Sequence, residues 1–460
     1  MPWYRAVADN RRPAKFRIAA RVPVAVALDA PEEELWAELD AKTPAFLDLW
    51  NSIRGGGAEL PTDPKAAVNL LDLTRELAYR MLAQCNFCRY DCGVDRTSGL
   101  RAQAAVNKTA SGSEVSSEPI AGPLPRRNEG EGTHGVSHAP VLEGNLAKGF
   151  GRTVTRKNLE KFGTCKLGAD SRVSTYFHHL GEELVYRGTA GSGTIFFTSC
   201  NMRCAFCQNG DISTDKDNGR VVSPRTAATM AWLLRMEGCH NINWVGGDPT
   251  IHLHTIVDAI SQLEELEPTE DDLAAALPGK ADYRFGFRLD RRNALYGGAF
   301  NAPMLWNSNF FMTGPAMKIL RLLMDVWLPD FKFGPGRCAP LLSKTPFYWE
   351  TVTENLTLIH DWGEDFTIRH LVMPNHVECC TAPVLKWVAE NVPDAPVNIM
   401  DQYHPDNFCD PASLKFNPKY RELARRITRD ELARAFRYAE ELGVRFESLS
   451  YEKNSTGLRL

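Results

Sequence analysis

The sequence predicts an α/β fold that contains a partial barrel of six strand and helix units, a partial (βα)6 barrel. The chain has 460 residues, of which 43% are apolar, and this is enough to form a large core. From residue 161 onward, short apolar runs alternate with amphipathic helical stretches, which is typical of a largely parallel sheet covered by helices. No run of about 18 apolar residues is present, so we expect no membrane partner.

Composition divides the chain into four parts. Residues 99–160 are rich in Ser, Gly, Pro, Asn and Glu and lack a periodic apolar pattern, so we expect a low-complexity, poorly ordered insertion there. The other parts are expected to be an N-terminal extension with a cysteine group, the partial barrel, and a C-terminal helical and strand extension, at residues 1–98, 161–410 and 411–460.

In the N-terminal extension the apolar pattern predicts a strand at Phe16–Val26, a helix from Glu32, and a second helix over Asp63–Leu82. In the C-terminal extension, Thr428-x-x-Glu431 is a capping box, and it predicts a helix that runs to about Leu442.

The partial barrel is predicted from six short apolar runs. Between the first two, Ser223 can cap a helix whose first residue is Pro224, and Gly238 can end it. The expected strands are Thr194–Thr198, Asn241–Val245, Met304–Asn307, Val326–Phe331, Phe366–Met373 and Val397–Met400.

Charge argues against a polyanionic partner. The formal net charge is −4 and the pI is about 6.3, so no overall basic field is available to hold a nucleic acid. The absence of a secretion pattern favours a cytoplasmic protein. An organellar location is the alternative, because the first 22 residues carry six basic residues against one acid.

The strongest chemical signal is Cys200-x-x-x-Cys204-x-x-Cys207, which directly follows the first barrel strand. Three thiolates on one loop can hold three irons of a [4Fe-4S] cluster and leave the fourth iron without a protein ligand. An iron with an open position can chelate the amino and carboxylate groups of S-adenosyl-L-methionine. The structural alternative is a zinc site of three cysteines completed by a histidine.

A second group, Cys85-x-x-Cys88-x-x-x-Cys92, is followed by Cys165. Four thiolates would close a site for zinc or for an auxiliary iron-sulfur cluster, and the alternative is four reduced cysteines without metal. The other cysteines are expected to be core or surface thiols, with redox activity as an alternative for the vicinal pair at 379 and 380; they are Cys239, Cys338, Cys379, Cys380 and Cys409.

The chain resembles the radical SAM superfamily, and within it the group similar to the pyruvate formate-lyase activating enzyme. The resemblance spans residues 75–98 and 160–405 and depends on the segments GSGTIFF, CNMRCAFCQN, WLPDFKFG, IRHLVMPN and VNIMDQY. It implies an oxidoreductase that uses a [4Fe-4S] cluster, S-adenosyl-L-methionine and a low-potential electron donor, with Cys200, Cys204 and Cys207 at the catalytic centre.

The resemblance also implies cofactor-binding residues. Phe206 would pack beside the cluster, and the turn Gly246-Gly247-Asp248-Pro249 would receive the methionyl amino group, although the family usually has Glu or another turn at Asp248. The further candidates are Asp330 for the ammonium, Lys332 and Arg369 for the carboxylate, and Asn307 and Asn309 for the ribose. An ordinary ion pair is the alternative for Asp330 and Lys332. Gln402 and His404 lie where substrate would enter, with loop roles as their alternative.

The functional hypothesis is a radical enzyme that generates a 5′-deoxyadenosyl radical for hydrogen abstraction, with a glycyl-radical protein as the candidate partner. Radical modification of a small molecule or of another protein or peptide substrate is the alternative within enzymes. A non-catalytic iron-sulfur carrier is the alternative from another class. A zinc-based nucleic-acid module is disfavoured, because neither cysteine group lies in a basic stretch with interleaved aromatic residues.

Overall fold

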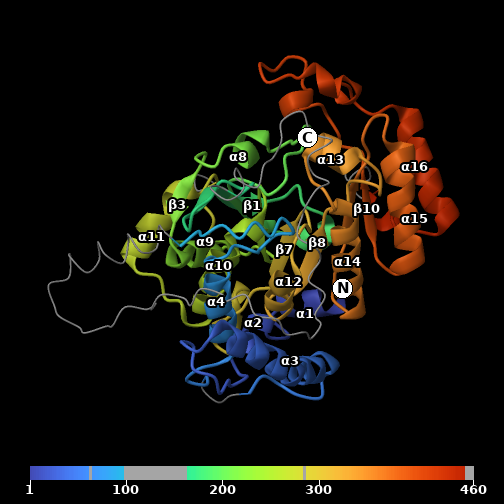
Figure 1. Ribbon diagram of the computed structural model, residues 1–460. Coiled ribbons are helices and arrows are strands. Elements are labelled where there is room, and N and C mark those ends of the chain that lie inside the picture. Colours follow the sequence, from blue (N-terminus) through green and yellow to red (C-terminus); the bar gives the residue numbers. More distant parts are fainter. Residues whose placement is uncertain (62–64, 98–162, 283–285, 451–460) are drawn as a thin grey trace, which may run out of the picture.

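The computed structural model describes residues 1–61, 65–97, 163–282 and 286–450, and its centre is a parallel sheet (Figure 1). Parallel pairing connects β2, β4, β7 and β8, and it connects β9 to β10. Parallel bridges from Trp327 to Phe366 and from Asp330 to Arg369 join β8 to β9. The parallel strands are β2 (Ser192–Phe197), β4 (Ile242–Gly246), β7 (Met304–Ser308), β8 (Val326–Pro329), β9 (Ile368–Leu371) and β10 (Val397–Met400). This order confirms the predicted partial barrel of six parallel strands.

An antiparallel edge extends the sheet beyond β2. Strand β1 (Ser171–His179) pairs antiparallel with β2 and, on its other side, with β3 (Arg220–Val222). The sequence analysis did not predict this edge. A short hairpin, β5 (Leu295–Tyr296) with β6 (Ala299–Phe300), lies apart from the main sheet.

Helices surround the sheet, and the predicted one after β2 is confirmed. Helix α9 spans Pro224–Met236, the Ser223 side chain accepts a hydrogen bond from the Thr226 N–H, and Gly238 follows with φ +101°. The other helices are α1 (Pro2–Ala8), α2 (Lys15–Ala19), α3 (Glu32–Gly55), α4 (Leu70–Arg80), α7 (Leu184–Arg187), α8 (Gly210–Thr214), α10 (Leu253–Gln262), α11 (Glu270–Ala276), α12 (Gly314–Arg321), α13 (Cys338–Ser343), α14 (Tyr348–Asp361), α15 (Ala382–Asn391), α16 (Arg429–Leu442) and α17 (Glu447–Ser450).

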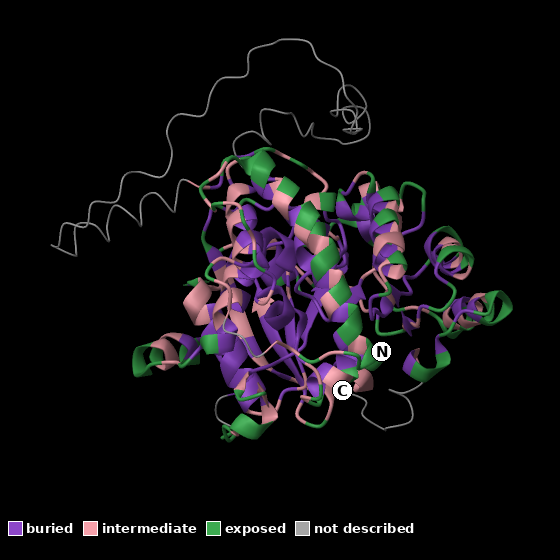
Figure 2. Ribbon diagram, turned by 90° about the horizontal axis from the view of Figure 1, so that it is seen from below, coloured by how far each residue is buried: buried purple, intermediate pink, exposed green. Residues whose placement is uncertain are grey.

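The core lies between the sheet and its helices, and Figure 2 shows buried residues concentrated on the strands while exposed residues mark the outer helix faces. Trp244, Trp306 and Trp327 stand on three adjacent parallel strands and are fully buried. Such burial favours apolar runs rather than alternation, which is why the strands could be predicted from short apolar segments.

Two N-terminal predictions are wrong. The segment predicted as a strand at Phe16–Val26 begins with helix α2, whose Lys15 and Arg17 are buried and paired with Glu364 and Glu264. Strand propensity was overridden here by these long-range ion pairs. Helix α4 begins at Leu70 rather than near residue 63, because Asn69 caps it and forms a capping box with Asp72. Residue 63 itself and the predicted insertion at 99–160 lie outside the described residues.

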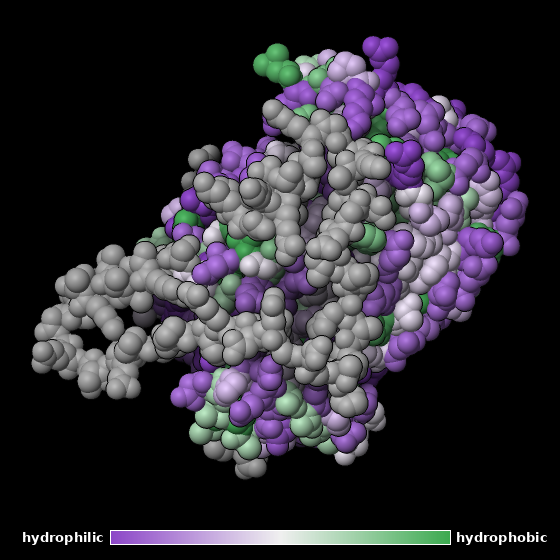
Figure 3. Space-filling view, viewed as in Figure 1, coloured by the Kyte–Doolittle hydropathy of each residue, from purple (hydrophilic) through white to green (hydrophobic). Residues whose placement is uncertain are grey.

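The C-terminal helix is confirmed. Helix α16 begins after Thr428, whose hydroxyl accepts the Glu431 N–H in a capping box, and it ends at Leu442. On the face shown in Figure 3, hydrophilic residues predominate where the surface is coloured. Across the described ranges, no helix is both long enough and apolar enough to cross a bilayer.

Candidate active site

A cavity of about 330 Å³ opens at the carboxyl ends of the parallel strands. Each of these strands, or the loop that follows it, contributes to its wall. Of the predicted site residues it is lined by Cys200, Cys204, Phe206, Cys207, Gly246, Gly247, Asp248, Asn307, Asn309, Asp330, Lys332 and Arg369. Pro249 is buried as the first residue of a 3-10 helix (Pro249–His252) and does not line the cavity.

The three cysteines lie on the loop that follows β2. Ser199 has φ +62°, which turns the chain sharply before Cys200, and the Cys200 sulfur accepts the Met202 N–H at 3.2 Å. A single zinc ion bound at about 2.3 Å would need sulfurs roughly 3.8 Å apart. Across the described residues, the three sulfurs are not among the groups whose ligand atoms all lie within 4.8 Å. Among the described residues, the three sulfurs are therefore not preassembled as the compact set that one zinc ion needs.

Burial makes two of these thiols costly to ionise. It raises the pKa of Cys200 well above its usual value, with Asp248 adding to the effect, and it raises the pKa of Cys204 to about 12 against the opposing charge of Lys332. Buried thiols remain protonated at neutral pH unless a metal takes the place of the proton. The donor set therefore fits an iron-sulfur cluster, which would be held by Cys200, Cys204 and Cys207.

The glycine pair brings the end of β4 against the cysteine loop. A Cβ at Gly246, whose φ is +136°, would lie 2.1 Å from the Phe197 carbonyl oxygen, and one at Gly247 would lie 1.6 Å from the Ser199 carbonyl oxygen. The Gly247 N–H donates to Phe197 O at 2.8 Å and the Asp248 N–H donates to Ser199 O at 3.0 Å. The missing side chains thus allow two backbones to meet directly at the cavity wall.

Asp248 connects two strand ends. Its carboxylate accepts the Asn309 N–H at 2.8 Å and the Thr250 N–H at 2.9 Å, so it fixes the loop after β7 to the loop after β4. Burial raises the pKa of Asp248 to about 6, although these hydrogen bonds oppose the shift.

We expect Asp248→Ala to lower the free energy of unfolding by about 2–4 kcal/mol, because it leaves two buried N–H groups without an acceptor. Urea unfolding of the metal-free chain measures this value. Asp248→Asn keeps one acceptor oxygen, so it should lower the free energy of unfolding by less than Asp248→Ala does. Equal stabilities of the Ala variant and the wild type would contradict this role.

The Asn309 side chain faces the loop of Cys200, Cys204 and Cys207 rather than open solvent. Its side-chain amide donates to the Cys200 sulfur at 3.6 Å and to Asn201 Oδ1 at 2.6 Å. Asn201 in turn donates to the Phe311 carbonyl oxygen at 3.3 Å. The ribose contact predicted for Asn309 stays a prediction, and in this structure its amide hydrogen-bonds the Cys200 sulfur.

Asp330 and Lys332 form an ion pair at the end of β8. Lys332 Nζ lies 2.5 Å from Asp330 Oδ2, and both side chains are about one-fifth exposed. Burial lowers the pKa of Lys332, but the charge of Asp330 and its hydrogen bond to Lys332 raise it above its usual value. The ammonium therefore stays charged beside the cysteine loop.

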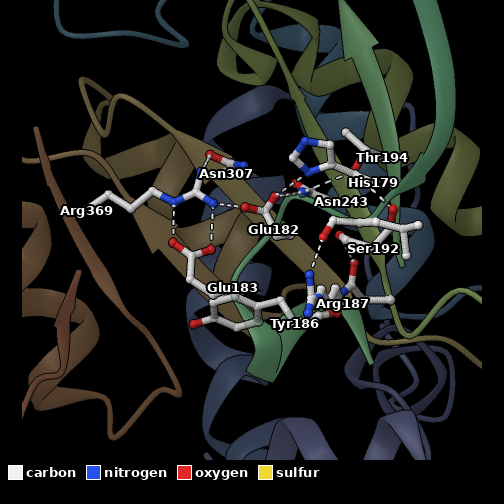
Figure 4. Close-up of polar contacts among 12 residues, drawn as sticks. His179, Glu182, Glu183, Tyr186, Arg187, Ser192, Thr194, Asn243, Asn307 and Arg369 are labelled. Carbon is white, nitrogen blue, oxygen red and sulfur yellow. Dashed lines mark hydrogen bonds and ion pairs between the residues drawn. The ribbon is translucent and has the colours of Figure 1, made fainter. Parts of the chain in front are cut away.

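Arg369 joins a network that the sequence analysis missed (Figure 4). Its guanidinium donates to both Glu183 oxygens at 2.9 and 2.7 Å and also pairs with Glu182. Asn243 donates to Glu182 at 2.8 Å. Of the two glutamates, Glu182 lines the cavity. A sequence signal existed, since Glu182 and Glu183 follow Gly181 between two apolar runs, and adjacent buried carboxylates require a cation.

Of the remaining predicted residues, some line the cavity and others pack or pair outside it. The Phe206 ring packs 6.0 Å from those of Phe333 and Tyr403. Gln402 lines the cavity, whereas His404 does not and instead pairs with Asp406 at 2.9 Å. His370, next to Arg369, is fully buried and hydrogen-bonds Phe331 O and the Thr381 hydroxyl.

The second cysteine group lies next to the first. The loop that carries Cys88 pairs with Met312, just after the end of β7, and the Ser199 hydroxyl donates to the Cys165 carbonyl oxygen at 2.7 Å. Arg96 is buried, and its guanidinium donates to the Cys85 sulfur at 3.6 Å. A buried cation beside sulfur favours thiolate over thiol.

Comparisons with known proteins agree with this site. The profile of the Radical SAM superfamily matches residues 194–287, which include the cysteine triad and the glycine pair. An uncharacterised protein of Methanocaldococcus jannaschii is 30% identical over 446 residues, which cover 96% of this chain and 97% of that protein.

Solved structures show weaker similarity. SuiB of Streptococcus suis, bound to S-adenosylmethionine, has 10% identity and a TM-score of 0.34, with 54% of this chain and 48% of SuiB covered. The structure of anSMEcpe with bound AdoMet has 14% identity and a TM-score of 0.31, with 57% of this chain and 61% of that one covered. The chain thus spans less than two thirds of either structure. The profile match thus identifies residues 194–287, which carry the cysteine triad and the glycine pair, as a radical SAM region.

Proposed function

We propose that this cavity binds a [4Fe-4S] cluster through Cys200, Cys204 and Cys207, together with S-adenosyl-L-methionine. The observation that carries the proposal is the convergence of three thiols and several ligand-type side chains, from different strand ends, on one cavity. When bound, the reduced cluster and the cofactor supply a 5′-deoxyadenosyl radical that abstracts hydrogen from substrate.

The chain's own residues would orient the cofactor. Lys332 carries a cation next to Cys204, which suits the methionyl carboxylate, and Asp330 offers a carboxylate for the ammonium. Asn307 is buried on the same wall and suits the ribose hydroxyls.

Arg369 also lines the cavity, but its guanidinium is already paired with Glu182 and Glu183. We propose that it positions these two carboxylates, while its contact with the cofactor carboxylate stays a prediction. Glu182 would then present an anionic oxygen to the cavity, which complements the positive sulfonium of the cofactor.

The hydrogen donor is proposed to be a glycyl residue of a partner protein, with a low-potential protein as the electron source. Radical modification of a small molecule or of another peptide is the second candidate. Substrate deuterated at the hydrogen that is abstracted distinguishes these from a carrier without catalysis, since deuterium that appears in 5′-deoxyadenosine identifies what enters the cavity.

The experiment that tests the proposal is anaerobic reconstitution with iron and sulfide, followed by dithionite and S-adenosyl-L-methionine. We expect 5′-deoxyadenosine and methionine in equal amounts. A cluster of full iron content that yields neither product would overturn the proposal and support an iron-sulfur carrier.

The Asn309 amide gives a separate prediction. Because it donates to the Cys200 sulfur, its removal in Asn309→Ala should make the reduction potential of the cluster more negative. Redox titration followed by electron paramagnetic resonance measures the shift. Asn391→Ala, on the exposed end of α15, is the matched control, and equal potentials of Asn309→Ala and wild type would exclude the proposed hydrogen bond.

For the second group we propose an auxiliary iron-sulfur cluster on Cys85, Cys88, Cys92 and Cys165, with zinc as the alternative. The support for this proposal is the donor set itself, because four cysteines can close an iron-sulfur cluster. Its place beside the triad suits a relay for electrons from the donor.

A further inference from the structure

A third cysteine group assembles away from both of the others. The Cys338 sulfur lies 3.6 Å from the Cys379 sulfur and 3.5 Å from His376 Nδ1. His376 Nδ1 lies 3.2 Å from the Cys379 sulfur, and the Cys379 and Cys380 sulfurs are 3.9 Å apart. All four ligand atoms fall within 4.8 Å of one another, which no other group of such residues does in the described part of the chain.

These separations match those around one tetrahedral zinc ion. Zinc–sulfur bonds of about 2.3 Å place two sulfurs roughly 3.8 Å apart, and a zinc–nitrogen bond of about 2.0 Å places nitrogen and sulfur roughly 3.5 Å apart. Three thiolates and one imidazole are also a ligand set of structural zinc sites. The expectation that Cys338, Cys379 and Cys380 are separate core or surface thiols is therefore replaced, because the fold brings them together.

The local backbone is shaped to bring these residues together. His376, Cys379 and Cys380 lie at and within a π-helical turn (Val377–Thr381), and π-turns are rare and frequent at functional sites. Cys338 is the first residue of α13 and arrives from a loop that packs on this turn. A Cβ on Gly334 would lie 2.1 Å from the Cys379 carbonyl oxygen, so glycine is needed for this approach.

The surroundings also suit a metal ligand. His376 is buried, and its other nitrogen, Nε2, makes no hydrogen bond within the described part of the chain; a Glu422 carboxylate oxygen lies 3.7 Å away, just beyond hydrogen-bond distance. Histidines that bind metal through one nitrogen commonly direct the other N–H to a carboxylate. Cys379 is exposed, which provides a path for an ion to enter.

We propose that Cys338, His376, Cys379 and Cys380 bind one structural zinc ion that fixes α13 to the π-helical turn after β9. The opposite end of α13 holds the cluster loop, since the Arg203 N–H donates to Ser343 O at 2.9 Å and the Ala205 N–H donates to Leu342 O at 2.7 Å. The zinc ion thus supports the loop of the cysteine triad from outside the cavity.

The test is zinc analysis of the full-length protein, purified anaerobically, together with zinc X-ray absorption. We expect about one zinc per chain, bound by three sulfurs and one nitrogen. Cys338→Ser should weaken zinc binding more than about 100-fold in chelator competition, whereas Cys239→Ser, outside all three cysteine groups, should leave it unchanged. Hydrogen exchange at Arg203 and Ala205 should become faster in Cys338→Ser.

His376→Cys keeps the test decisive if Cys338→Ser does not fold, because it should retain zinc with four sulfurs instead of three and one nitrogen. Zinc-free wild-type protein would overturn the proposal. So would four sulfurs around zinc in the wild type, which would place the ion in the second group, or full zinc affinity in Cys338→Ser.

Discussion

Cys204→Ala should lower the rate of 5′-deoxyadenosine formation more than about 100-fold, because removal of a ligand costs at least as much as removal of a supporting residue. Cys204 lies at the cavity, and its sulfur is next to the Lys332 ammonium. The remaining two thiols cannot hold three irons. The measurement is product formation under dithionite, with iron content determined on the same samples.

The matched control is Cys239→Ala. Cys239 is fully buried, lies outside all three cysteine groups, and has a sulfur directed at the Ala190 carbonyl oxygen at 3.9 Å. We expect it to retain iron and product formation. If Cys204→Ala kept the activity of this control, the assignment of the triad would be wrong.

Gly247→Ala should disrupt the site of the cysteine triad, because the added methyl group displaces the backbone next to it. The added Cβ would fall 1.6 Å from Ser199 O and 2.5 Å from Ser199 C, and both are main-chain atoms that cannot rotate away. Either the cysteine loop or the end of β4 must move. We expect a loss of about 3 kcal/mol or more in the free energy of unfolding, with a lower iron content after reconstitution.

Gly55→Ala provides the control for Gly247→Ala. Gly55 is the last residue of α3, and nothing lies within 4 Å of the Cβ that alanine would add. Alanine favours a helix over glycine, so stability should stay equal or rise slightly. Urea unfolding and iron analysis compare the two variants, and full iron content in Gly247→Ala would contradict the close approach of β4 to the cysteine loop.

Much of the fold could be predicted from the sequence, because the parallel strands are buried and read as short apolar runs. β10 was predicted with both its ends, and the other five differ by at most two residues at either end. Some predictions included residues that continue beyond the ladder, such as Asp330 and Phe331 after β8, and others stopped short of it, as at Ser308 of β7. The main candidate site could also be found from the sequence, because its three cysteines lie within eight consecutive positions.

What the sequence did not reveal depends on partners far away along the chain. Lys15 is buried because Glu364 lies beside it, 349 residues later, and no local pattern indicates that pairing. Glu182 and Glu183 meet Arg369 only through the arrangement of β9 beside the loop before β2. Cys338 and His376 are 38 residues apart and meet across two different loops.

The central claim is that one iron of the triad's cluster is left free for S-adenosyl-L-methionine. The most direct measurement is electron paramagnetic resonance of the reduced, reconstituted protein before and after this cofactor is added, with iron-57 and cofactor labelled at the amino nitrogen. We predict a changed spectrum and a coupling between the labelled nitrogen and the cluster. An unchanged spectrum at full iron occupancy, without such coupling, would contradict the account.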